Sequence, residues 1–160
     1  FKPIMVSVVF FLTLSGVLDI FPILNDHSIS IQDIPNNKAA TYINDNSPRN
    51  SVFLNSSYLY HPASIAGRKI MMGWPYIPWS AGYDTDSRGK LMDKIYGSTS
   101  KAEICSMLLK NKVDYFTIQD TANDRDFVKI DLDFFNNNFL IEYSDQTISM
   151  INVSKNCLEP

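Results

Sequence analysis

A long apolar run near the N-terminus limits what this chain can fold into more than any other feature of its sequence. Residues 4–18, IMVSVVFFLTLSGVL, carry no charge, and the apolar character resumes after Asp19 over residues 20–24. The run is about as long as the roughly 20 residues that a helix needs to cross the hydrocarbon core of a bilayer. We therefore expect residues 1–25 to form a transmembrane helix, with Asp19 and Pro22 at its outer interface.

Two other interpretations of this run stay open. A buried core helix normally shows polar residues on one face, whereas the first half of the run offers only Ser7. A cleaved signal peptide would use Lys2 as its basic end and residues 13–16 as its small-residue cleavage site. Because the chain begins with Phe1 and not with Met, we expect a piece of a longer protein, whose last membrane helix is this run.

The remaining residues, 26–160, have the length of one ordinary domain, and helix and strand patterns alternate along them. This alternation predicts an α/β layered domain with a mostly parallel sheet, closed by a C-terminal hairpin that turns at residues 144–146. The expected strands are residues 51–55, 68–72, 113–119, 139–143 and 147–153. The expected helices are residues 37–45, 61–66, 86–96 and 131–137, with a further one opened by the capping box Ser100-Lys-Ala-Glu103.

Charge and cysteine patterns exclude several classes of function. A net charge of -3 with interspersed signs argues against a nucleic-acid partner. Cys105 falls in an apolar helical pattern that favours a buried thiol, and Cys157 lies in a polar tail. A bridge between them is open, because spacing alone does not decide it. Metal-binding and phosphate-loop motifs are not found, so we expect no metal and no cofactor.

The most distinctive chemistry lies between Ser51 and Arg88, a segment that holds both tryptophans of the chain. A guanidinium group can bind phosphate oxygens at two points, which makes Arg68 and Arg88 candidate anion-binding residues. Aromatic rings can stack on the apolar face of a sugar, and phenol or imidazole groups can bond its hydroxyls. The candidates for these contacts are Trp74, Trp79, Tyr76, Tyr83, Tyr60 and His61.

Each of these residues also has a structural interpretation. The tryptophans, each next to a proline, can anchor their own loop or lie at lipid headgroups. His61 precedes a proline and fits a helix cap or turn, and Arg68 fits a buried partner for Asp84 or Asp19. The sequence does not decide between these roles.

The order of these segments resembles a known family. An Asn-Ser-Pro helix end is followed by SVFLNSSYLYHPASIAGRK, GWPYIPW, an arginine, KVDYFTI and a last strand ISMINV. This succession resembles the extracytoplasmic C-terminal domain of GT-C membrane glycosyltransferases. It is most like multi-pass proteins with the YYY signature and more distantly like the oligosaccharyltransferase catalytic subunit. The likeness covers roughly residues 19–153 and rests on order and spacing.

The resemblance implies a function for the chain as part of a larger protein. It implies transfer of a sugar from a lipid-linked phosphate donor, with the soluble domain on the extracytoplasmic side of the membrane. Catalytic loops of this family lie between earlier membrane helices, so the missing transmembrane part is an expected partner and the chain alone should be inactive. The oligosaccharyltransferase motif Trp-Trp-Asp-Tyr-Gly is replaced here by residues 55–59, NSSYL, which retain only the tyrosine.

Two functions without catalysis compete with this one. The chain could be a membrane-anchored extracytoplasmic binding or sensor module. It could also be a structural accessory subunit whose aromatic segment packs against helices of another protein.

Overall fold

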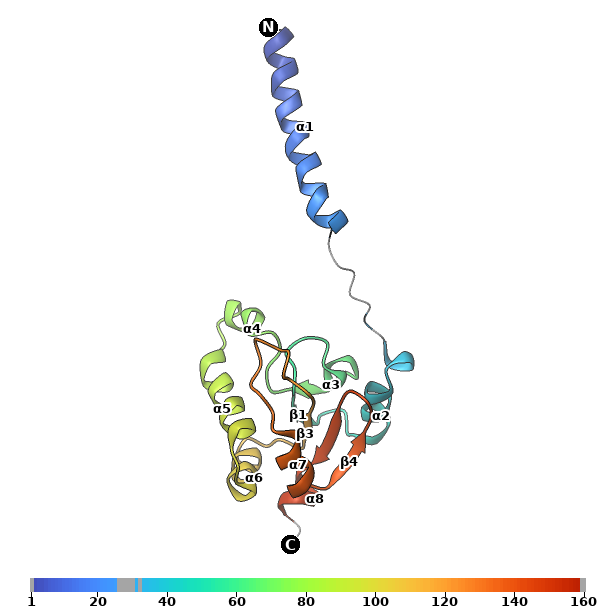
Figure 1. Cartoon of the computed structure of the whole chain (residues 1–160), viewed down its shortest axis with the longest axis vertical. Helices are drawn as coiled ribbons and strands as arrows, with labels where there is room; N and C mark the ends of the chain where they lie inside the picture. Colours follow the sequence, from blue (N-terminus) through green and yellow to red (C-terminus); the bar gives the residue numbers. More distant parts are fainter. Residues whose placement is uncertain (1, 26–30, 32, 159–160) are drawn as a thin grey trace. The chain divides into compact units, whose positions relative to one another are not determined.

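The computed structural model describes residues 2–25, 31 and 33–158 of the chain. The chain divides into two compact units, Phe1–Ile31 and Gln32–Pro160. A single helix is described in the first unit, and a sheet covered by helices makes up the second (Figure 1).

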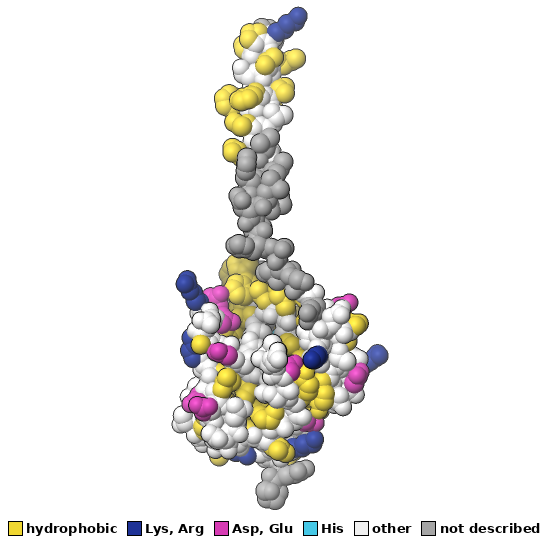
Figure 2. Space-filling view, turned by 45° about the vertical axis from the view of Figure 1, so that its right-hand side comes forward, with side chains coloured by type: hydrophobic (Ala, Val, Ile, Leu, Met, Phe, Trp, Pro, Cys, Tyr) yellow, Lys and Arg dark blue, Asp and Glu magenta, His cyan; other side chains and the backbone are white. Residues whose placement is uncertain are grey.

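Helix α1, Lys2–Asn25, takes up most of the first unit. Its large apolar side chains are exposed at nearly every position between Ile4 and Leu12, where only Ser7 interrupts them (Figure 2). Because an α-helix turns once in about 3.6 residues, these neighbouring side chains cover all of its faces. Counting only the residues that the structure describes, no helix is both long enough and apolar enough to cross a membrane.

The second unit is an α/β domain built on one five-stranded sheet in the order β2-β1-β3-β5-β4. The strands lie at the predicted places along the chain, although each is shorter than its sequence pattern. They are β1 Val52–Leu54, β2 Lys69–Ile70, β3 Tyr115–Ile118, β4 Ile141–Ser144 and β5 Ser149–Asn152.

The sheet is mixed, so the expectation of a mostly parallel sheet is correct only for one half of it. Strands β2, β1 and β3 run parallel, with Phe53 opposite both Ile70 and Tyr115. The predicted C-terminal hairpin is present as the antiparallel pair β4 and β5. Its second strand inserts between β3 and β4 and pairs antiparallel with β3, which makes the other half of the sheet antiparallel.

Helices cover both faces of this sheet because successive strand residues point to opposite sides. Leu54 of β1 packs in the core cluster of α5 and α6, whereas its neighbour Phe53 packs in the cluster of α2 and α3. Figure 1 shows these two helix pairs on either side of the strands. The helices of this unit are η1 Ile34–Asn36, α2 Lys38–Asn46, α3 Pro62–Ile65, α4 Tyr76–Ser80, α5 Thr85–Gly97, α6 Lys101–Lys110, α7 Leu132–Asn138 and α8 Val153–Cys157. Of these, η1, α4 and α8 were not predicted. The aromatic segment that contains α4 reads as a loop, and α8 starts at Val153, which was expected to end the last strand.

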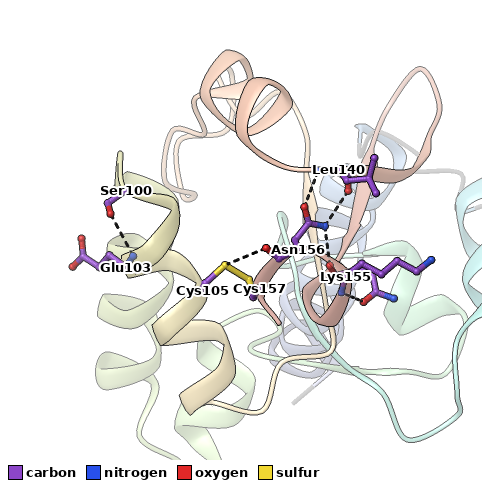
Figure 3. The surroundings of a disulfide bond; sticks show 8 residues. Ser100, Glu103, Cys105, Leu140, Lys155, Asn156 and Cys157 are labelled. Atoms are coloured by element: carbon purple, nitrogen blue, oxygen red, sulfur yellow. Dashed lines mark hydrogen bonds between the residues drawn. A yellow bond between two sulfur atoms is a disulfide. The ribbon is translucent and has the colours of Figure 1, made fainter. Parts of the chain in front are cut away.

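Helix caps explain where several of these helices begin. The Ser100 hydroxyl accepts from the backbone N–H of Glu103, which confirms the predicted start of α6 (Figure 3). The reciprocal bond of a capping box is absent at this site, since the Glu103 carboxylate accepts instead from Ser98. Asp131 caps α7 in the same manner through the N–H of Phe134.

A disulfide joins Cys105 of α6 to Cys157 of α8, with 5.3 Å between their Cα atoms (Figure 3). The expectation of a buried Cys105 thiol was therefore wrong, and the alternative that spacing left open is the correct one. Next to the bridge, the Asn156 side chain bonds both backbone groups of Leu140. The bridge and this amide together fasten the last helix to the body of the domain.

Candidate functional site

Arg68 is buried, with only 8% of its surface exposed, and it binds within the fold. Its Nε donates to the Ser47 hydroxyl at 3.0 Å and its Nη1 to the Ala66 carbonyl at 2.7 Å. Its Nη2 donates to carbonyls at the end of α2, those of Ile43, Asn44 and Ser47. A cation at this place also complements the negative end of the helix dipole. Oxygens at the end of α2 therefore accept most of the hydrogen bonds that the guanidinium donates. The sequence had suggested an aspartate or a phosphate as its partner.

His61 is buried at the start of α3. Its Nδ1 accepts from the N–H of Ala63, so it caps α3, which was one of its predicted roles. The proton therefore lies on Nε2, which donates to the Thr117 hydroxyl at 2.9 Å. Burial lowers the pKa of His61 to about 3. A neutral, enclosed imidazole of this kind is not placed to meet a substrate.

The aromatic residues of the predicted site separate into two groups. Trp79, Tyr83 and Tyr60 are each more than half exposed. Trp79 meets the ring of Tyr76 within α4, at 5.5 Å between centroids. Trp74 is partly buried and lies with its ring edge-on to Tyr58, at 6.3 Å.

Trp74 belongs to a hollow of about 270 Å³, which we call the Tyr58 hollow. Its lining is aromatic on most sides and carboxylate on one, and consists of Tyr58, Trp74, Pro75, Tyr76 and Asp126. A second hollow of similar volume adjoins it and shares Tyr58 and Pro75. The first turns of α5 line that second hollow with Asp86, Lys90 and Asp93 among other residues.

Acidic side chains surround the phenol of Tyr58. The pKa of this hydroxyl is raised above its usual value, mainly by burial. The negative charges of Asp93, Asp124 and Asp126 raise it further. The phenol is therefore protonated at neutral pH and can donate a hydrogen bond, while the carboxylates can accept them. A sugar can be bound by aromatic rings that stack on its apolar face and by carboxylates that accept hydrogen bonds from its hydroxyls.

The parallel half of the sheet positions the Tyr58 hollow. Tyr58 lies in the segment after β1 and Trp74 in the segment after β2, so both follow the carboxyl ends of parallel strands. The buried Asn55 side chain joins these two ends, because its Nδ2 donates to the Met72 carbonyl at 2.7 Å and its Oδ1 accepts from the Met72 N–H. Ligand sites of open α/β sheets commonly lie at this edge.

The loop between β3 and α7 forms the remaining wall of the Tyr58 hollow. Phe127 packs on the Tyr58 ring at 4.8 Å between centroids, next to the lining residue Asp126. Lys129 holds the loop in shape, since its ammonium donates to the carbonyls of Thr121, Ala122 and Asp124 at 2.6 to 2.7 Å. These three bonds use all the donors of the ammonium group.

Sequence reasoning missed Tyr58 and Asp126 as members of one site. They are separated by most of the domain along the chain, and no local pattern connects them. The available signal was the aromatic residue after each of two parallel strands, Tyr58 and Trp74. Of the residues that the sequence proposed for sugar contacts, Trp74 and Tyr76 line this hollow.

Arg88 lies on the other side of α5 from the lining residues Asp86 and Lys90, and it is exposed. Its Nη1 donates to the Met71 carbonyl at 3.1 Å. It lines a separate hollow together with Lys69 and Leu91 among others. Arg88 and Arg68 therefore do not share a site.

A comparison with protein families and with curated proteins gave no match to this chain.

Proposed function

We propose that this chain is the C-terminal part of an integral membrane glycosyltransferase that transfers a sugar from a lipid-linked phosphate donor. In this proposal residues 1–25 are the last membrane segment, and Gln32–Pro160 is an extracytoplasmic domain that binds the sugar in the Tyr58 hollow. Catalytic loops would come from other parts of the same protein. The hollow supplies recognition and orientation, and the chain alone does not catalyse transfer.

The observation that carries the proposal is the composition of the Tyr58 hollow. Trp74 and Tyr58 meet edge-on, so two ring surfaces at an angle face a ligand, and Asp126 adds an acceptor for hydroxyl groups. Contacts within the fold fix both residues. The Tyr58 ring packs on Phe127, and the Asn55 side chain bonds Met72 in the segment that leads to Trp74. A preorganised site loses less side-chain entropy when it binds its ligand.

Two further observations support the membrane and extracytoplasmic parts of the proposal. Disulfides persist in oxidising compartments and are rare in the cytosol, so the Cys105–Cys157 bridge favours an extracytoplasmic domain. Exposed apolar side chains on all faces of α1 fit a lipid environment better than an aqueous one.

The experiment is a titration of the full chain in lipid nanodiscs with short-chain polyprenyl phosphate sugars, measured by isothermal titration calorimetry. We expect saturable binding of at least one hexose derivative and about a tenfold weaker affinity for Trp74→Ala, which corresponds to about 1.4 kcal/mol. Trp79→Ala is the matched control, because Trp79 does not line the hollow. Equal affinity of the Trp74 variant and the wild type would remove the Tyr58 hollow from the proposal.

A membrane-anchored binding module is the second candidate. The hollow fits it because ring surfaces and one carboxylate are enough to hold a sugar without any chemical step. Such a module would bind free oligosaccharide as well as it binds the lipid-linked sugar. The glycosyltransferase part would bind the lipid-linked form more tightly, since its substrate includes the phosphate.

A further inference from the structure

Arg88 lines a separate hollow, which we call the Arg88 hollow. Its charged lining residues are positive, whereas the charged residue of the Tyr58 hollow is negative. It encloses about 430 Å³ between the sheet and α5. Its lining residues are Val52, Lys69, Ile70, Met71, Ser87, Arg88, Leu91 and Asn111. Two of these are cations and none is acidic. A volume of this size falls in the range of small-molecule sites.

The position of the Arg88 hollow follows from the sheet order. Strand β2 is the last strand on its side, so no described strand or helix extends the sheet beyond Lys69. Helix α5 crosses this end of the sheet and places Arg88 and Leu91, three residues apart, on the face that it turns toward β2. The hollow between them stays open to solvent.

The two halves of the lining differ in chemistry. Leu91, Met71 and Val52 contribute apolar surface, with Leu91 and Met71 packed on the main core cluster. Lys69 and Arg88 contribute positive charge at the rim. The Met71 carbonyl accepts from Nη1 of Arg88 at 3.1 Å, which orients the guanidinium and leaves its other N–H groups available to a ligand.

Two carboxylates lie close to this hollow without lining it. Asp114 accepts from the N–H of the lining residue Val52 at 2.8 Å through its Oδ2. Asp84 lies before α5 and caps it by accepting from the Ser87 N–H. Hydrogen bonding from the Ser87 side chain, and then from its N–H, lowers the pKa of Asp84. Neither carboxylate is among the residues that line the hollow.

We propose that the Arg88 hollow binds a small amphipathic anion, a single carboxylate or phosphate group joined to a short apolar chain. The guanidinium of Arg88 takes the anionic group in a two-point contact, Lys69 adds charge, and the chain lies on Leu91 and Met71. This site is independent of the Tyr58 hollow, because the two share no lining residue.

Short-chain probes test this proposal with the full chain in nanodiscs. Hexanoate and butyl phosphate carry the two kinds of anion, while hexanol and butanol carry the same chains without charge. Inorganic phosphate alone tests the charge without a chain. Methyl NMR of Met71 reports occupancy directly, since this residue lines the hollow.

We expect saturable shifts of the Met71 methyl signal with hexanoate, butyl phosphate or both, and at least tenfold weaker binding of the matching alcohols. Arg88→Gln should weaken anion binding about tenfold, and Lys69→Gln by less. Arg49→Gln is the matched control, an exposed arginine outside the hollow, and should bind as the wild type does.

Three results would overturn the proposal. They are equal binding of alcohol and anion, unchanged affinity in Arg88→Gln, or inorganic phosphate binding as tightly as butyl phosphate. The response of hexanoate relative to butyl phosphate identifies which anion the site prefers. The sugar titration at Trp74 is unaffected by any of these results, so the two proposals fail separately.

Discussion

Breaking the Cys105–Cys157 bridge should destabilise the domain strongly. The bridge joins residues 52 positions apart. In the chain-entropy model, a loop of this length contributes roughly 4 kcal/mol to stability at 25 °C, because closure removes conformations from the unfolded chain. For a domain of this size, that loss corresponds to a drop of roughly 15 °C in the melting temperature.

Urea unfolding followed by far-UV circular dichroism measures this effect. The oxidised chain, the same chain under reductant, and the variant with both Cys105→Ala and Cys157→Ala are compared. The reduced chain and the double variant should unfold at a similar, lower urea concentration, and reductant should not move the midpoint of the double variant. Thiol titration establishes that reduction is complete.

Unfolding of the fully reduced chain at the same urea concentration as the oxidised one would contradict this prediction. A loss well below 2 kcal/mol would mean that residual structure in the unfolded chain already restrains α6 against α8.

Three other perturbations test individual side chains. Arg68→Lys should lose about 2 kcal/mol of stability in chemical unfolding, because a compact ammonium cannot reach all the oxygens that the guanidinium bonds. Unchanged stability would contradict the structural role of Arg68. His61 has a folded pKa of about 3, so between that value and about 6.5 only the unfolded chain binds its proton. Stability should fall by about 1.4 kcal/mol per pH unit as the pH drops below 6.5, and His61→Gln should lose this dependence in unfolding curves at pH 5 and 7. Lys129→Met should speed hydrogen exchange in the loop after β3 and weaken sugar binding at the Tyr58 hollow severalfold, while an unchanged exchange rate would contradict its positioning role.

Local patterns predicted the elements of the domain well. Strand β1 and the start of α6 at Ser100 depend on residues that are close in sequence, so their signals are visible without the fold. The direction of β5 was not visible in this way. A hairpin pattern predicts pairing with β4, but it does not say which of its strands will insert beside β3.

The candidate site depended on contacts that no local pattern encodes. Arg68 bonds mostly backbone carbonyls, which every residue has, so its partners could not be read from side-chain types. Tyr58 and Asp126 meet only because the loop after β3 folds back over the end of β1. The disulfide likewise depends on α6 and α8 packing together across a long stretch of chain.

Sugar transfer by the longer membrane protein to which the proposal assigns this chain tests the central proposal most directly. Membranes carrying the wild-type protein, or the same protein with Trp74→Ala, are supplied with a radiolabelled polyprenyl phosphate sugar, and label in the acceptor is counted. The proposal predicts transfer by the wild type and a kcat/KM about tenfold lower for the variant at equal protein level, because the sugar loses one of its ring contacts. Absence of transfer with every hexose donor, or equal kcat/KM for the two proteins, would contradict it.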